Sequence, residues 1–208
     1  MSKVTVLSHP LIDHKMAQVR DKNTSTKAFR ETVSEIGALI TYEITRDLAT
    51  KPKEIETPMT KTTVYELEKH VVIIPILRAG LGMVEGMHNM IPTAKIGHIG
   101  LFRNEETLEP EVYYQKFPDV VNDSVVLLVD PMLATGGSAS FAIKMLKEHG
   151  VKDIRYVGLI GCPTGVERLQ KDHPDVHIYL AAMDEILNDQ GYIVPGLGDC
   201  GDRIFGTK

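Results

Sequence analysis

The residues with the clearest potential for chemistry follow an apolar run, Val125–Val129, in the sequence VVLLVDPMLATGGS. Asp130 ends this run, and two adjacent glycines, Gly136 and Gly137, come shortly after it. Adjacent glycines let the backbone turn sharply and present its N–H groups without a Cβ in the way. A helix is predicted to start directly after them, and the positive end of its dipole would favour an anion. The segment therefore predicts a phosphate-binding loop.

The polar side chains of this segment indicate that the phosphate belongs to a sugar. Thr135 and Ser138 add hydroxyl donors, and Asp130 is placed to accept hydrogen bonds from sugar hydroxyls. The alternative is a tight turn in which Asp130 only caps the chain, but the strand before the turn and the helix after it favour a ligand site. The Walker pattern GxxxxGK[ST] is absent, and the fingerprint GxGxxG follows none of the predicted strands, so the two common nucleotide-binding loops are set aside.

Two arginines follow other predicted strands. Arg78 lies among small residues in PILRAGLG, and Arg103 begins the polar stretch RNEETLEP. A guanidinium group binds phosphate oxygens with two parallel hydrogen bonds, so each arginine could hold a pyrophosphate. An isolated arginine is usually a solvated surface charge. Because both of these follow strands on the predicted ligand edge, we expect them to bind the ligand.

The C-terminal stretch 188–203 has four glycines and one proline, and it shows no helical period. Such backbone freedom is expected where a loop surrounds a ligand. A planar base could lie near Tyr192 and be recognised by backbone groups. A plain surface tail is the alternative, which composition alone does not exclude.

The elements that must position these residues alternate between strands and helices. Buried strands are predicted from apolar runs at Val71–Ile76, Ile96–Leu101, Val125–Val129, Ile154–Ile160 and Val176–Ala181. Helices are predicted at Ser138–His149 and Thr164–Asp172. This alternation predicts an α/β fold with a mostly parallel central sheet flanked by helices on both faces, and ligands bind such sheets at the carboxyl ends of the strands.

The first third of the chain predicts a helix and a hairpin. Phe29, Val33, Ile36 and Ile40 recur at helical spacing after a capping Ser25 or Thr26. The stretch KEIETPMTKTTVYEL alternates around a proline-containing turn and predicts a small hairpin. The spacing of three methionines is helical and predicts that they belong to the core: Met83, Met87 and Met90.

Composition sets limits on the class of protein. The chain has 208 residues, 43% of them hydrophobic, and a net charge of −5, which argues against a general nucleic-acid binder. Its two cysteines form no disulfide framework, and its histidines form no metal set. No signal peptide or membrane span is recognised, so we expect a cytoplasmic protein that does not bind membranes.

Four segments together closely resemble the uracil phosphoribosyltransferases, within the type I phosphoribosyltransferases: PILRAGLGM, LFRNEETLEP, VDPMLATGGS and GYIVPGLGDCGDRIFGTK. The resemblance extends to HPLIDHK and STKAFRE near the start, so it spans essentially the whole chain. Asp130-Pro131 replaces the two acidic residues that are usual in type I enzymes, and the pair is specific to the uracil enzymes. Cys200 stands where the family usually has alanine; we expect it to be tolerated, although it leaves open a changed pocket or sensitivity to thiol reagents.

The resemblance implies one phosphoribosyltransferase domain over residues 1–208, with a C-terminal hood that binds the base. Residues 1–50 would form an N-terminal arm and helix, 71–181 the core sheet, and 182–208 the uracil-binding segment. The implied reaction transfers the 5-phosphoribosyl group of 5-phosphoribosyl 1-diphosphate (PRPP) to N1 of uracil, giving UMP and pyrophosphate in pyrimidine salvage. Asp199 is expected to contact PRPP or its ion.

The resemblance also implies the site residues. Those expected to bind PRPP are Arg78, Arg103, Asp130, Pro131, Met132, Leu133, Ala134, Thr135, Gly136, Gly137, Ser138 and Asp199, of which Arg78, Arg103, Asp130 and Asp199 are expected to be catalytic. Those expected to bind uracil are Tyr192, Ile193, Gly198, Asp199 and Cys200.

Further expectations concern cofactors and partners. Mg²⁺ should arrive with PRPP, because the chain offers no carboxylate cage. The family implies a homodimer or higher oligomer, and GTP activates some of its members. Two alternatives stay open: a phosphoribosyltransferase for another base, such as a purine, and a PRPP-sensing regulator without catalysis. The C-terminal segment argues against the first, and the absence of a basic face or an added DNA-binding domain argues against the second.

Overall fold

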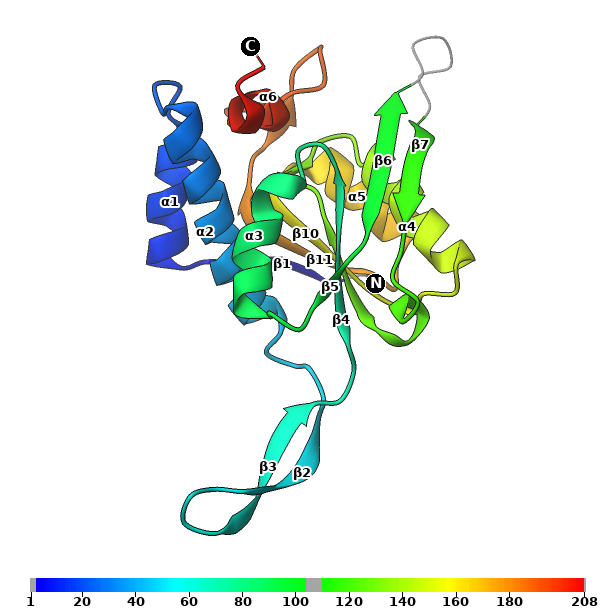
Figure 1. Ribbon diagram of the computed structural model, residues 1–208. Helices are drawn as coiled ribbons and strands as arrows, with labels where there is room; N and C mark the ends of the chain where they lie inside the picture. The colour runs from blue at the N-terminus through cyan, green and yellow to red at the C-terminus, as the bar shows by residue number, and fades with distance from the viewer. Residues whose placement is uncertain (1–2, 104–109, 208) are drawn as a thin grey trace.

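The fold is seen in a computed structural model that describes residues 3–103 and 110–207, without the side chain of Arg103 (Figure 1). The strands are β1 (Val4–Val6), β2 (Thr50–Glu56), β3 (Lys61–Leu67), β4 (Val71–Leu77), β5 (Lys95–Ile96), β6 (His98–Arg103), β7 (Pro110–Lys116), β8 (Val125–Val129), β9 (Met132–Leu133), β10 (Asp153–Gly161), β11 (His177–Met183), β12 (Ile186–Leu187) and β13 (Ile193–Val194). The helices are α1 (Pro10–Arg20), α2 (Thr26–Ile44), α3 (Leu81–Met90), α4 (Gly137–Glu148), α5 (Pro163–Asp172) and α6 (Cys200–Phe205), with a 3₁₀ turn at Val121–Asp123.

A mostly parallel sheet forms the centre of the molecule. Its strand order is β1-β11-β10-β8-β4-β6-β7, with β5 beside β4 and β9 beside β10. The pair β6–β7 is antiparallel, and every other neighbouring pair in this strand order is parallel. The predicted sheet is therefore confirmed, although the run 96–101 is divided between β5 and β6.

Helices cover both faces of the sheet, with α1, α2 and α3 on one side and α4 and α5 on the other (Figure 1). Successive residues of β4 point to opposite faces: Val71 and Ile73 pack under α2 and α3, while Val72 and Ile74 pack on the α4 side. The alternation follows from the two-residue period of a strand. It explains why these strands appear in the sequence as continuous apolar runs.

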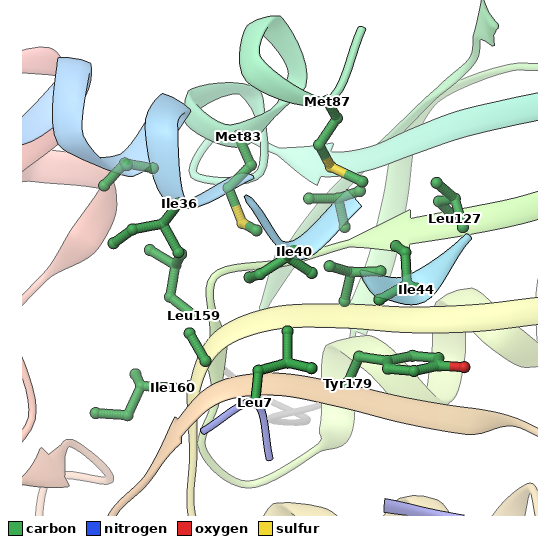
Figure 2. Close-up of a cluster of buried hydrophobic side chains, with 14 of the residues drawn as sticks. Leu7, Ile36, Ile40, Ile44, Met83, Met87, Leu127, Leu159, Ile160 and Tyr179 are labelled. Atoms are coloured by element: carbon green, nitrogen blue, oxygen red, sulfur yellow. The ribbon is translucent and has the colours of Figure 1, made fainter. Parts of the chain in front are cut away.

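The apolar residues that recur at helical spacing in α2 pack on the sheet. Ile36, Ile40 and Ile44 point from α2 towards the sheet, where Leu127 and Leu159 meet them (Figure 2). Ser25 caps this helix by accepting a hydrogen bond from the N–H of Ala28 at 3.3 Å. The predicted helix and its cap are thus confirmed.

Of the three methionines predicted to lie in the core, two do. Met83 and Met87 are fully buried on α3 and point into the cluster below α2 (Figure 2). Met90 is 46% exposed, so its prediction was wrong. It is the last residue of α3, where the helix leaves the core.

The hairpin β2–β3 is confirmed and projects away from the body of the molecule (Figure 1). Every residue of β2 is exposed, and Tyr65 of β3 is 72% exposed. In contrast to the central strands, the hairpin has no helix packed on either face in Figure 1. This explains its weak alternation in the sequence.

The first residues form a strand and a helix where the sequence predicted an arm. β1 pairs with β11 and so extends the sheet beyond residues 71–181. His9, predicted to lie in an arm, is the N-cap of α1, and its Nδ1 accepts a hydrogen bond from the N–H of Leu11 at 3.1 Å. Ile12, Met16 and Val19 on α1 are buried against the core. No described helix is long and apolar enough to cross a membrane.

Candidate active site

Two parallel strands deliver the first polar residues to the same edge of the sheet. In the pairing of β4 with β8, Pro75 lies opposite Val129. Asp130 directly follows β8, and Arg78 directly follows β4 across a cis peptide bond from Leu77. The prediction that polar residues after these strands lie at one edge is therefore correct.

The loop after Asp130 has a backbone that requires glycine at one position. Gly136 has a φ of 73°, in the left-handed region, and a Cβ there would lie 2.9 Å from the carbonyl oxygen of Gly165. Gly137, by contrast, starts α4, and a Cβ on it would meet only side-chain atoms at 3.4 Å or more. The predicted glycine turn at the start of a helix is present.

A cavity of about 880 Å³ opens beside this loop, and we call it the loop cavity. Four residues of the predicted phosphate loop line it: Ala134, Thr135, Gly137 and Ser138. Side chains of α4 and α5 form much of the rest of its wall, and Phe102 of β6 also contributes. A cavity at a helix N-terminus, lined by backbone and hydroxyl donors, suits a phosphate.

A second cavity of about 230 Å³ lies next to it, and we call it the C-terminal cavity. It is lined by every residue predicted to bind the base, namely Tyr192, Ile193, Gly198, Asp199 and Cys200. Asp130 and Met132 form part of its wall. Ala134 and Gly191 line both cavities, so the two spaces are neighbours.

Asp130 has the most perturbed carboxyl group of the site. Burial raises its pKa to about 7, and a hydrogen bond from the backbone of Met132 opposes that rise. Tyr156 holds the backbone of Asp130 in place: its buried hydroxyl donates a hydrogen bond to the Asp130 carbonyl oxygen at 2.9 Å. A carboxyl group that lines a cavity and has a pKa near neutral pH is frequently a functional group.

The C-terminal segment is held over the sheet edge by Asp184, which is buried. Arg20 of α1 donates to both carboxylate oxygens of Asp184, at 2.7 and 2.8 Å, and to the carbonyl oxygen of Gly196 at 2.9 Å. The N–H of Gly196 donates to the same carboxylate at 2.8 Å. The Arg20 guanidinium therefore holds the pKa of Asp184 below its usual value.

A second arginine ties the same segment to the N-terminal helices. Arg203 donates to the carbonyl oxygens of Leu197 at 2.7 Å and of Asp21 at 2.6 Å, and it stacks over the ring of Phe29. The segment predicted to lack helical period contains the short helix α6, which Asp199 caps by accepting from the N–H of Asp202 at 2.8 Å. The cap and the arginine contacts stabilise this helix, whose six residues are too few to show a period in the sequence.

Cys200 is buried in the wall of the C-terminal cavity. Burial raises the pKa of its thiol, and the nearby carboxylates of Asp130 and Asp199 raise it further. Thiols react as thiolates, so this environment disfavours reaction with thiol reagents. Of the two possibilities left open by the sequence, a change in pocket shape is the better supported.

The structure also separates some of the predicted residues from the cavities. Pro131 and Leu133 are buried, and their carbonyl oxygens accept hydrogen bonds from residues around the end of β10. Gly136 is buried against Gly165 and lines neither cavity. These three residues shape the loop.

The two predicted arginines have different outcomes. Arg78 lies at the sheet edge with its guanidinium 3.6 Å from Asp202 and 5.7 Å from the ring centre of Phe205. Arg103 is the last residue of β6, and its side chain and the polar stretch 104–109 lie outside the described residues.

Sequence reasoning missed several residues of the cavity walls. Arg168 and Asp172 of α5 line the loop cavity, and Ala79 lines the C-terminal cavity. Arginine and aspartate four positions apart on a helix are typical of an exposed ion pair, so the spacing alone gave no signal of a site.

Comparisons with known proteins identify the family. A sequence model of the uracil phosphoribosyltransferase family matches residues 6–207. The uracil phosphoribosyltransferase of Acholeplasma laidlawii is 70% identical over 208 residues, and that of Clostridium perfringens is 60% identical over 209 residues; both alignments cover all of both chains.

Solved structures agree with these relatives. A protein of Aquifex aeolicus is 39% identical, covers 99% of both chains and has a TM-score of 0.94. The adenine phosphoribosyltransferase of Trypanosoma brucei shares the fold at 13% identity, with a TM-score of 0.61 over 92% of this chain and 88% of that one. The predicted type I phosphoribosyltransferase fold and enzyme class are confirmed, and the chain belongs to the uracil phosphoribosyltransferase family.

Proposed function

We propose that the two neighbouring cavities together bind the substrates of the family's reaction, in which PRPP donates its 5-phosphoribosyl group to N1 of uracil and UMP and pyrophosphate form. The observation that carries the proposal is their shared wall at Ala134 and Gly191, with Asp130 beside it. A ribose lying at that wall would reach the loop with its 5-phosphate and the C-terminal cavity with its C1 atom.

The 5-phosphate would bind to Ala134–Ser138. Thr135 and Ser138 offer hydroxyl donors to the loop cavity, and the backbone of Gly137 begins α4 there. A helix start provides N–H groups that have no partner within the helix, and its dipole favours negative charge. The loop therefore binds the 5-phosphate through hydrogen-bond donors alone.

The ribose hydroxyls would donate to Asp130. Its carboxyl is half-buried at the end of β8 and faces the C-terminal cavity. In the ligand-free protein the pKa of this carboxyl is about 7, because burial disfavours the charge. Two hydroxyl donors favour the ionised form, so ligand binding should lower that pKa and release a proton near neutral pH.

The leaving pyrophosphate would be neutralised by Arg78 and Arg103. The exposed Arg78 lies beside Asp202 and Phe205, and from there its guanidinium can turn towards a phosphate. As pyrophosphate leaves C1, positive charge develops on the sugar and N1 of uracil attacks. Positioning and charge stabilisation are the main catalytic contributions in such a transfer.

Magnesium would come with PRPP. Within residues 3–103 and 110–207 no three His, Cys, Asp or Glu side chains gather into a metal site. Mg²⁺ often keeps several waters and takes one or two carboxylates besides substrate phosphates, and Asp130 and Asp199 offer two at the C-terminal cavity. These residues fit such an ion, which would offset the negative charge of the pyrophosphate.

Uracil would be recognised by backbone groups of Ile193 and Gly198–Cys200, with its ring near Tyr192. Ile193 is held in β13 by its pairing with Leu187, and Gly198 has a φ of 78° that favours glycine. Backbone groups fixed in this way could present a set of donors and acceptors to one edge of the base. A GTP effector, a homodimer or larger oligomer and a cytoplasmic location remain predictions from the resemblance.

The first prediction concerns the base. Uracil offers an acceptor, a donor and an acceptor on one edge, and cytosine mismatches at two of these three positions. Sites that hydrogen-bond a substrate reject such analogues by roughly 10⁴-fold or more. Pyrophosphate release from PRPP should therefore be fast with uracil and at least that much slower, in kcat/KM, with cytosine or hypoxanthine. Comparable rates with cytosine and uracil would contradict the proposed base site.

The second prediction concerns the phosphate loop. In Gly137→Val the fold should survive, because the nearest atoms to a Cβ at this position belong to the Arg168 guanidinium and the Thr135 hydroxyl, at 3.4 Å or more. The added methyl groups should occupy the space of the phosphate, so calorimetric titration should detect no PRPP binding. Glu148→Val, at the exposed end of the same helix, is the matched control and should bind PRPP normally. Normal affinity in a folded Gly137→Val protein would place the phosphate elsewhere.

The third prediction concerns pH. Because the Asp130 carboxyl has a pKa of about 7 and must ionise to bind the ribose, raising the pH should favour PRPP binding in the wild type. The ratio of wild-type to Asp130→Asn affinity should rise roughly tenfold between pH 6 and pH 8. The protonation of the ligand's own phosphates affects both proteins equally, so its effect on affinity cancels in this ratio. A ratio that does not change with pH would show that Asp130 is not the titrating group.

A further inference from the structure

An arginine that the proposed reaction does not use lies beside the phosphate loop. Arg168 of α5 lines the loop cavity together with Thr135, Gly137 and Ser138. A Cβ built on Gly137 would lie 3.4 Å from its Nη1 and 3.9 Å from its Cζ. The guanidinium group therefore lies against the first residue of α4, where the 5-phosphate is proposed to bind.

The loop itself has no positive side chain to match such a ligand. Residues 134–138 are Ala-Thr-Gly-Gly-Ser, so they offer hydroxyl and backbone donors only. A phosphate monoester carries about −1.5 to −2 charges at pH 7. A guanidinium group offers a planar fork of donors that fits two phosphate oxygens. Arg168 would supply the charge that the loop lacks.

Arg168 is oriented by a carboxylate that is itself held in place. Its Nε lies 3.6 Å from Oδ2 of Asp172, one helical turn away. That same oxygen accepts a hydrogen bond from the Ser140 hydroxyl of α4 at 2.8 Å. The Ser140 hydrogen bond, and after it the Arg168 charge, lower the pKa of Asp172, so the carboxylate stays ionised.

Ser140 is fixed in turn by a buried histidine. Nε2 of His173 lies 2.9 Å from the Ser140 carbonyl oxygen, and Nδ1 of His173 lies 3.4 Å from Nζ of Lys147. These contacts fit a neutral ring that donates through Nε2 and accepts through Nδ1. Ser140, in the first turn of α4, thus links the phosphate loop to the carboxylate that orients Arg168.

A local ion pair on α4, of which only Lys144 lines the loop cavity, provides a contrast. Lys144 and Glu148 lie 3.9 Å apart on α4, with side chains 69% and 64% exposed. An exposed pair of this kind contributes little to stability and fixes little geometry. The Arg168–Asp172 pair is less exposed, at 49% and 36%, and its carboxylate is anchored to a second helix.

We propose that Arg168 binds the 5-phosphate of PRPP together with the loop, and that Asp172 positions Arg168 for this contact. The inference rests on the proposed function, because it takes the loop as the 5-phosphate site. It assigns substrate binding to a side chain outside the segment that the sequence predicted.

The test compares Arg168→Ala and Arg168→Lys with Lys171→Ala, an exposed cation on the same helix that does not line the loop cavity. Calorimetric titration with ribose 5-phosphate measures the affinity of the loop for the 5-phosphate. Titration with pyrophosphate measures the affinity of the leaving-group site. One lost charge-assisted contact should weaken ribose 5-phosphate binding of Arg168→Ala by about tenfold. Arg168→Lys should retain part of the affinity, and pyrophosphate binding and Lys171→Ala should be unchanged.

Steady-state kinetics then tests the positioning role. Asp172→Asn can still accept from Ser140 but no longer attracts Arg168, so we expect the KM for PRPP to rise about threefold to tenfold, with kcat, the KM for uracil and the melting temperature unchanged. Equal ribose 5-phosphate binding by Arg168→Ala and wild type, or weaker pyrophosphate binding instead, would overturn the inference. A wild-type protein that binds no PRPP would contradict the proposed function instead.

Discussion

The parallel pairing of β4, β8 and β10 is the constraint on which the candidate site depends. Parallel strands end at the same edge of a sheet, so Asp130 after β8 and Arg78 after β4 reach the same edge although 51 residues separate them in the chain. The pairing holds because the strands are apolar on both faces and are covered by helices on both sides. The polar residues of the candidate site then follow directly after the strands at this edge.

A second requirement is a cover for this edge, and the end of the chain provides it. Arg20 holds Asp184 and Gly196, and Arg203 holds Leu197 and Asp21, so the first and last parts of the chain are joined above the sheet. The C-terminal cavity forms between this cover and the strand ends. A loop rich in glycine needs such external contacts, because its own backbone has little conformational preference.

Much of this arrangement could be predicted from the sequence because the signals were local. Apolar runs followed by turn residues located the strands and the loop around Gly136, and resemblance supplied the family. Contacts between distant segments gave no such signal: the Arg20–Asp184 pair spans 164 positions, and the contact of Arg168 with the loop requires α5 to pack beside α4. Met90 shows the limit of a periodic pattern. It continues the helical spacing of the buried methionines, but it lies at the end of α3, beyond the core.

The central claim is that a single nucleotide bridges the two cavities, and a crystal structure of the chain with bound UMP tests it most directly. The account predicts phosphate oxygens within hydrogen-bonding distance of the backbone of 135–138 and the Arg168 guanidinium, ribose hydroxyls on Asp130, and the uracil ring against Ile193 and Gly198–Cys200. A phosphate bound away from the loop, or a ring outside the C-terminal cavity, would contradict it.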